Sequence, residues 1–317
     1  VLAVAGVSVP LAVAELRVPF PRLAVACVGI AVTRVSVPLR RRFPLAEFQA
    51  VARPRLIVSD LDGTFLAPDG SIPSLNVEAV RRAAGLGVGF VAATGRPTRW
   101  LDVLAELGTA QPLVIAANGA VLWDQAAHVV VEAIGIEVGL LSSVLETLRN
   151  AIPGLTFGVE TPDGFACEPA CPAARRGAAE LALSEAGLMR ISGPVVKLLG
   201  FHPGFEAGPL ADAAEQVVGG LVTVTHSARE GRYGLVEISA PGVSKASALQ
   251  RLCARLGVAA EQVAVFGDMP NDADMLAWAG LPHVVANAHP ALLAAGFPVV
   301  GSNADAGVGL AIHALLQ

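Results

Sequence analysis

The sequence predicts an α/β fold, with a Rossmann-like, doubly wound parallel sheet and an inserted α+β segment. From Arg55 onward, short apolar runs alternate with amphipathic helical stretches, which is typical of a parallel sheet. Polar groups follow several of these runs directly, and over residues 131–240 the pattern changes to shorter strands with hairpin turns. We therefore expect a core formed by residues 55–130 and 241–317, with residues 131–240 inserted as a second domain.

The core elements follow from local patterns. Val77, Val80 and Ala84 share one face of a predicted helix, and Ala248, Leu249 and Leu252 share one face of another. The expected core strands are 56–58, 88–93, 112–116, 263–266, 284–286 and 298–300, and the expected helices are 76–86, 98–107 and 245–256.

The inserted segment mixes helices with paired strands. Asp163-Gly164 and Glu230-Gly231 have the chemistry of hairpin turns. The expected helices are 138–149 and 174–185, and the expected strands are 155–160, 165–168, 195–201, 221–225 and 234–239.

Composition narrows the class of protein. The 317 residues suffice for two domains, and 54% hydrophobic against 15% charged residues provides a sizeable core. The net charge of -5, with no basic run after Arg40-Arg41-Arg42, predicts no nucleic-acid partner. The four cysteines lack the partners of a zinc site, so we expect reduced, buried thiols and a cytoplasmic protein.

The first 54 residues form an apolar but interrupted extension. Glu15 and Arg17 break the apolar start, and repeated prolines oppose a long helix, so no span of about 20 apolar residues exists. We expect residues 1–54 to be poorly ordered or non-native, read from a start site too far upstream, with the folded part beginning near Arg55. A membrane anchor is the alternative, and no membrane partner is expected.

The most informative motif is Asp60-Leu61-Asp62-Gly63-Thr64, directly after an apolar strand. Side chains at positions i and i+2 of an extended segment share one face, so both carboxylates can point at one centre. Their repulsion is relieved if a cation lies between them, which indicates Mg²⁺. A polar β-turn is the alternative interpretation of an isolated Asp-x-Asp.

Polar groups follow four predicted strands, at Asp60/Asp62, Thr94, Asn118 and Asp268/Asp272. Ligands of open parallel sheets bind beyond the carboxyl ends of the strands. Four such strand ends predict one convergent site.

These motifs resemble those of the haloacid dehalogenase superfamily, and specifically its Cof-type phosphatases with a large α+β cap. The resemblance covers about residues 55–315, with the motifs in the family's order. The matching segments are Asp60-Leu61-Asp62-Gly63-Thr64, Ala93-Thr94-Gly95-Arg96, Gly242-Val243-Ser244-Lys245, Gly267-Asp268-Met269-Pro270-Asn271-Asp272 and Asn287-Ala288. One departure is an inserted alanine in Asn303-Ala304-Asp305-Ala306-Gly307-Val308, which concerns the geometry of that loop.

The resemblance implies a role for each carboxylate. Asp60 is then the nucleophile that forms an aspartyl-phosphate, and Asp62 is the general acid and base. Mg²⁺ is held by Asp60, the backbone carbonyl of Asp62 and Asp268. Asp272 lies behind them and braces Lys245.

Four further residues are expected to bind the phosphoryl group. They are Thr94, the backbone N–H of Gly95, Lys245 and Asn271. The alternatives are a helix cap for Thr94 and a solvated helix-start lysine for Lys245.

Other polar positions allow two interpretations. Arg96 either contacts substrate or pairs with a carboxylate, and Asn118-Gly119 is either a tight turn or part of the substrate entrance. Four cap residues either contact substrate and set specificity or are solvated positions of a hairpin, and the sequence favours neither: Arg229, Arg232, Tyr233 and Glu237. No catalytic role is expected for the histidines at 202, 226 and 283.

The expected function is that of a Mg²⁺-dependent phosphatase acting on a small phosphorylated metabolite, such as a sugar phosphate. The cap would close over the substrate and select it. A phosphosugar mutase or phosphotransferase on the same core is one alternative, and a non-catalytic phosphate-binding regulator is another. A monomer or a homodimer is expected.

Overall fold

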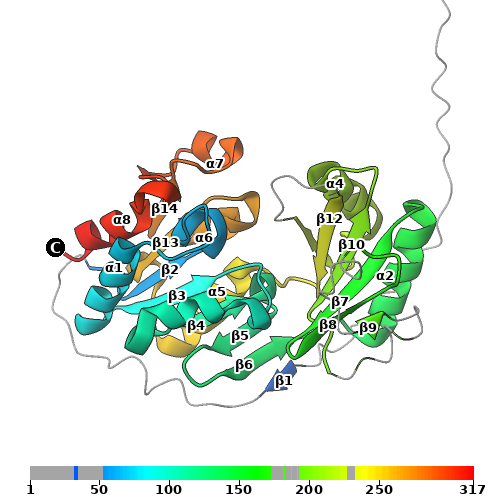
Figure 1. Ribbon diagram of the computed structural model, residues 1–317, viewed down its shortest axis with the longest axis horizontal. Coiled ribbons are helices and arrows are strands. Elements are labelled where there is room, and N and C mark those ends of the chain that lie inside the picture. The colour runs from blue at the N-terminus through cyan, green and yellow to red at the C-terminus, as the bar shows by residue number, and fades with distance from the viewer. Residues whose placement is uncertain are drawn as a thin grey trace, which may run out of the picture. The chain divides into compact units, whose positions relative to one another are not determined.

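A nine-stranded sheet, in the order β1-β6-β5-β4-β3-β2-β13-β14-β15, forms the core of the computed structural model (Figure 1). The structure describes residues 32–34, 53–172, 181–182, 187, 191, 193–226 and 233–317. The strands from β4 to β15 in that order are parallel to their neighbours. They are β4 (Leu113–Ala116), β3 (Gly89–Ala93), β2 (Leu56–Ser59), β13 (Val263–Gly267), β14 (Leu281–Val285) and β15 (Val299–Val300).

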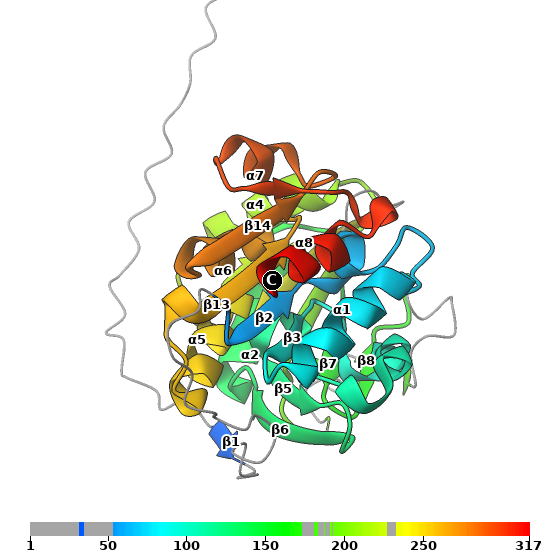
Figure 2. The same cartoon turned by 90° about the vertical axis from the view of Figure 1, so that its left-hand side faces the viewer.

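The sheet is doubly wound, as predicted. From β2 the chain proceeds to β3 and β4 on one side, and from β13 to β14 and β15 on the other. Helices α1 (Ser74–Gly85) and α8 (Gly307–Leu315) lie on one face, and α5 (Lys245–Leu256) and α6 (Ala273–Trp278) on the other (Figure 2). The short helix α7 (Pro290–Ala294) follows β14. The winding direction changes between β2 and β13, which is where an open sheet binds its ligand.

The sheet extends beyond the predicted strands. β5 (Val121–Asp124) and β6 (Val129–Ile134) continue it in antiparallel fashion, and the predicted core boundary at 130/131 falls within β6. β1 (Val32–Arg34) pairs with β6, so one short strand of the expected extension joins the sheet. Residues 1–31 and 35–52 lie outside the described residues.

The helix predicted at residues 98–107 is present, but as 3₁₀ helix and not as α-helix. Two 3₁₀ segments occupy this region, η3 (Thr98–Trp100) and η4 (Asp102–Ala110). Leu101, Leu104 and Leu107 are all buried, at a spacing of three residues. A 3₁₀ helix has three residues per turn, so this spacing places them on one line facing the core.

A second, six-stranded sheet forms the cap, in the order β11-β12-β10-β7-β8-β9. Its pairings are antiparallel except for β8 with β9. The strands are β7 (Thr156–Thr161), β8 (Gly164–Cys167), β9 (Leu181–Ala182), β10 (Lys197–His202), β11 (Thr223–Thr225) and β12 (Gly234–Ser239), with helices α2 (Val138–Ala151) and α4 (Ala207–Val218).

Two cap elements differ from expectation. Leu181–Ala182 is a strand inside the predicted helix 174–185, because it pairs with β8; the rest of that helix lies outside the described residues. Helix α4 was not predicted, because Gly208 and Pro209 resemble a loop. Proline is tolerated in the first turn of a helix, where its missing N–H has no partner to lose.

Both sheets belong to one unit, residues 31–317. Within the described ranges, no helix has the length and apolar character needed to cross a membrane.

Candidate active site

The two central strands deliver the acidic residues to one place. β2 and β13 are parallel neighbours, and Asp60 and Asp268 follow them directly. The Asp60 N–H donates to the carbonyl of Phe266 (3.0 Å), which ties the first carboxylate to the second strand. Gly63 adopts a φ of 84°, so the chain can turn away immediately after the strand.

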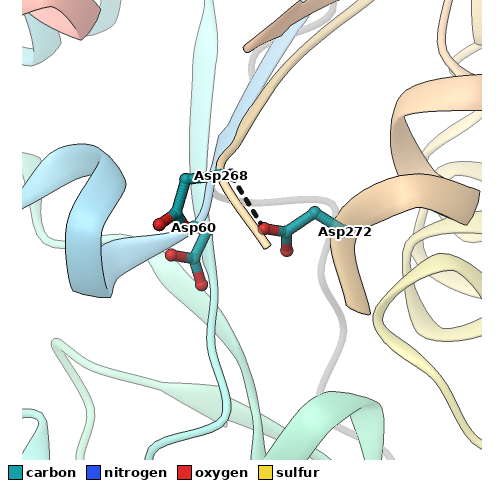
Figure 3. Close-up of side chains that lie close together, drawn as sticks. All are labelled: Asp60, Asp268 and Asp272. Atoms are coloured by element: carbon teal, nitrogen blue, oxygen red, sulfur yellow. Dashed lines mark hydrogen bonds between the residues drawn. The ribbon is translucent and has the colours of Figure 1, made fainter. Parts of the chain in front are cut away.

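Asp60, Asp268 and Asp272 form a buried carboxylate cluster (Figure 3). One oxygen from each lies within 4.8 Å of the others. Thr64 Oγ1 donates to Asp268 Oδ1 (3.0 Å). Gly267 is required here, because a Cβ at this position would lie 2.6 Å from the Cβ of Asp272.

Lys245 is the cation of this cluster. Its Nζ donates to Asp60 Oδ1 at 2.6 Å and to Asp272 Oδ1 at 2.7 Å, and the side chain is buried. Ser244 caps α5 by accepting from the Ser247 N–H, which fixes Lys245 at the first position of the helix.

The charges of the cluster do not balance. Three carboxylates and one ammonium group leave two negative charges if all are ionised. Burial raises the pKa of Asp60 well above its ordinary value; Lys245 opposes this, while Asp272 and Asp268 add to it. Burial alone would lower the pKa of Lys245, but Asp272 and Asp60 outweigh it, so the pKa is raised and the lysine stays charged. A divalent cation would supply the missing positive charge.

Asp272 is fully engaged by protein donors. Its Oδ2 accepts the backbone N–H groups of Asp268 and Met269, both at 3.0 Å, and its Oδ1 accepts Lys245. Figure 3 marks the bond from Asp268. Asp272 therefore holds the loop and the lysine, as the sequence led us to expect, whereas Asp60 and Asp268 are better placed as metal ligands.

The side chain of Asp62 does not join the cluster. It is 57% exposed and receives two bonds from Arg96, Nε to Oδ2 at 2.8 Å and Nη2 to Oδ1 at 2.6 Å. Arg96 Nη1 also donates to the carbonyl of Trp100 (3.1 Å). Of the two interpretations of Arg96, pairing with a carboxylate is the one observed.

The expected phosphate-binding residues lie on three elements: Thr94 and Gly95 follow β3, Asn271 follows β13, and Lys245 begins α5. Thr94 is buried, and its Oγ1 accepts the Arg96 N–H (3.1 Å). This is a turn contact and not the alternative helix cap, because the next helical segment, η3, begins at Thr98 and Pro97 is its cap residue. Asn271 Nδ2 donates to Asn118 Oδ1 (3.4 Å). Asn271 Oδ1 is buried and has no hydrogen-bond partner among the described residues.

Side chains from the loops after β14 and β15 bond to the segment that follows Asp60. Asn287 Nδ2 donates to the Gly63 carbonyl (2.8 Å), and Asn303 Nδ2 donates to the Leu66 carbonyl (2.8 Å). Asn303 was not singled out from the sequence. The segment with the inserted alanine turns through Ala306, which has a φ of 53°.

The cap candidates separate into three groups. Glu237 is buried and bonded to Asn118 and to Lys197, a residue that was not predicted. The only sequence signal for Lys197 was a single charge within an apolar strand. Tyr233 is partly exposed, and Arg229 and Arg232 lie outside the described residues.

Comparisons with known proteins identify the family. Residues 57–312 match the haloacid dehalogenase-like hydrolases, and the chain belongs to this family. This confirms the predicted superfamily.

Two relatives from Bacillus subtilis have names of phosphatases. YxeH, whose name gives a provisional assignment as a phosphatase, is 28% identical over 275 residues, covering 83% of this chain and 98% of YxeH. YcsE, named a 5-amino-6-(5-phospho-D-ribitylamino)uracil phosphatase, is 26% identical over 268 residues, covering 82% and 94%. These relatives, with the family, confirm the predicted enzyme class.

A solved structure shares the fold. The haloacid dehalogenase-like hydrolase from Bacteroides thetaiotaomicron superimposes with a TM-score of 0.67 at 25% identity, covering 83% of this chain and 100% of that one. The α/β core with its added antiparallel sheet is thus the fold that the sequence predicted.

Proposed function

We propose that this protein is a Mg²⁺-dependent phosphatase that hydrolyses a small phosphorylated metabolite through an aspartyl-phosphate on Asp60. The observation that carries the proposal is the buried, net-negative cluster of Asp60, Asp268, Asp272 and Lys245 at the switch point of the sheet.

The donor set fits Mg²⁺. This hard cation prefers oxygen ligands and binds through one or two carboxylates together with substrate phosphate. Asp60 and Asp268 would hold it, with the backbone carbonyl of Asp62 as a third protein ligand. When bound, the ion neutralises charge on the phosphoryl oxygens and on the nucleophile.

In the first half-reaction, Asp60 attacks phosphorus and a bond forms between its carboxylate oxygen and the phosphorus. The bond from phosphorus to the ester oxygen breaks, and its electron pair goes to the leaving oxygen. Asp62 gives that oxygen a proton, so an alcohol leaves. Arg96 fixes the direction of the Asp62 carboxyl group through two hydrogen bonds. To act as the acid, Asp62 must carry a proton when the ester bond breaks.

In the second half-reaction, Asp62 takes a proton from water, and the water oxygen attacks phosphorus. The bond between phosphorus and Asp60 breaks, which regenerates the carboxylate and releases inorganic phosphate. Truncating Asp62 should therefore slow both halves.

The phosphoryl group would be held by Lys245, the Thr94 hydroxyl, the Gly95 N–H and Asn271. The hydroxyl of Thr94 accepts from the Arg96 N–H, so its own proton is available for the phosphoryl oxygen. Asn271 Oδ1, which has no hydrogen-bond partner in the described part of the chain, would suit a water molecule on the metal.

The substrate class is proposed to be small phosphomonoesters, with sugar phosphates among them. Two relatives, YcsE and YbjI of Escherichia coli, are named for a substrate that carries phosphate on a ribityl chain. The cap, residues 131–240, would exclude bulk water and select the leaving group.

The test is turnover of p-nitrophenyl phosphate by the full chain. Activity should require Mg²⁺, disappear with a chelator, and be abolished in Asp60→Asn. The exposed helix residue Asp274 provides the matched control, because Asp274→Asn removes an acidic group outside the cluster and should retain activity. Turnover by Asp60→Asn would overturn the assignment of the nucleophile.

A further inference from the structure

A buried ion pair in the cap reaches the loops of the core. Lys197 on β10 and Glu237 on β12 are 3% and 5% exposed, and Lys197 Nζ donates to Glu237 Oε1 at 2.8 Å. The two strands are antiparallel neighbours with Leu199 opposite Glu237, so Lys197 is the diagonal neighbour of Glu237 on the same face.

Each member of the pair also bonds to a loop at a core strand end. Lys197 Nζ donates to the Gly95 carbonyl, after β3, at 2.9 Å. Glu237 Oε2 accepts from Asn118 Nδ2, after β4, at 2.8 Å. Asn118 Oδ1 in turn accepts from Asn271, after β13, at 3.4 Å. The pair thus contacts two of these loops directly and the third through Asn118.

The bond to Gly95 acts on Thr94. The Gly95 carbonyl belongs to the same peptide group as the Arg96 N–H, and that N–H donates to Thr94 Oγ1. Lys197 therefore fixes the plane of the peptide that orients the Thr94 hydroxyl, and it polarises this peptide toward a stronger N–H donor.

Stability alone does not account for this arrangement. Replacing a buried ion pair with apolar residues of similar volume is often neutral or stabilising, because desolvation offsets the attraction between the charges. An apolar pair could not bond to the Gly95 carbonyl or to the Asn118 amide that accepts from Asn271.

We propose that Lys197 and Glu237 are positioning residues for phosphate binding. Lys197 holds the Gly95–Arg96 peptide, which orients Thr94, and Glu237 holds the Asn118 amide, which accepts from Asn271. They couple docking of the cap to the order of the phosphate-binding loops, because the anchors belong to the cap. The inference rests on the proposed function and deepens it.

The test compares the double variant Lys197→Met/Glu237→Leu with the wild type. Removing both charges strands no charge but takes one partner from the Gly95 carbonyl and one from the Asn118 amide, so we expect a modest fall in melting temperature and a folded variant. The kcat/KM for p-nitrophenyl phosphate should nevertheless fall about 10- to 100-fold, the cost of slightly misplaced groups. The Kd of inorganic phosphate with Mg²⁺, measured by calorimetry, should rise with it. If either single variant fails to fold, the double variant still decides.

Arg149→Met is the matched control. It breaks another ion pair within the cap, Arg149 with Glu168, and should lower the melting temperature without changing kcat/KM or the phosphate Kd. The proposal is overturned if the double variant keeps both wild-type values, or if Arg149→Met loses as much activity as the double variant. Failure of the proposed function would appear separately, as a wild type that binds phosphate but does not hydrolyse the ester.

Discussion

The substitution Lys245→Met tests the charge arrangement of the candidate active site. Lys245 is buried and bonds to Asp60 and Asp272 at 2.6 and 2.7 Å, and Asp268 lies in the same cluster. Methionine keeps much of the volume but leaves the three carboxylates without their cation. We therefore expect the variant to lose stability because of stranded charge and not because of a cavity.

The magnitude follows from the burial of the pair. Removing one partner of a buried ion pair costs about 3–5 kcal/mol. For a domain of this size, 1 kcal/mol shifts the melting temperature by roughly 2–4 °C, so a loss of about 6–20 °C is expected.

The loss should also depend on pH. Burial raises the pKa of Asp60, and the charge of Lys245 partly opposes this rise. Without Lys245, the pKa of Asp60 should therefore be higher still. A carboxyl group whose folded-state pKa lies above its unfolded value of about 3.9 destabilises the fold as pH rises through the folded pKa. The difference between wild type and Lys245→Met should therefore shrink as the pH is lowered from about 8 toward about 5.

The assay is thermal unfolding of the metal-free full chain at both pH values. The control is the double variant Asp60→Asn/Lys245→Met, which removes one negative charge together with the cation and should be more stable than Lys245→Met alone. If the stability of Lys245→Met lay within about 1 kcal/mol of wild type, the range of an exposed ion pair, the expected burial cost would be absent and the prediction wrong.

Three further predictions concern the surroundings of the cluster. Arg96→Met should change the melting temperature little, because its partner Asp62 is exposed. It should lower kcat more for an alkyl phosphate than for p-nitrophenyl phosphate, since a poor leaving group depends more on a positioned acid. Equal losses of kcat for the two substrates would contradict this. Burial lowers the pKa of His283, so below about pH 6.5 the unfolded chain binds a proton that the folded chain resists. The wild type should therefore lose stability relative to His283→Phe as the pH falls. Parallel curves of stability against pH for the two proteins would contradict this. Gly119→Ala should cost about 1–3 kcal/mol in denaturant unfolding, because its Cβ would overlap the carbonyl oxygen of Ser244 and φ is 100°; an unchanged midpoint would contradict this.

The core could be predicted from sequence because its signals are local. Helix α5 has the predicted bounds, since Ser244 caps its start and Gly257 ends it in the left-handed conformation. The acidic cluster could be anticipated because parallel strands bring their carboxyl ends to one edge, so Asp60 and Asp268 meet although more than half the chain separates them.

The side-chain partners could not be predicted in the same way. Arg96 and Asp62 are 34 residues apart, and the sequence allowed Arg96 to contact substrate equally well. Lys197 and Glu237 could be read as ordinary strand positions, because their burial depends on how the cap packs against the core loops. Long-range packing, and not local pattern, decides such contacts.

The proposed function requires that Asp60 carries the phosphoryl group during turnover. The direct measurement is mass spectrometry of Asp62→Asn after a rapid acid quench with p-nitrophenyl phosphate and Mg²⁺, because this variant should form the intermediate and hydrolyse it slowly. We expect one added phosphoryl group, located on the peptide that contains Asp60 and absent from Asp60→Asn/Asp62→Asn. A phosphoryl group on another residue, or hydrolysis by Asp60→Asn at the wild-type rate, would contradict it.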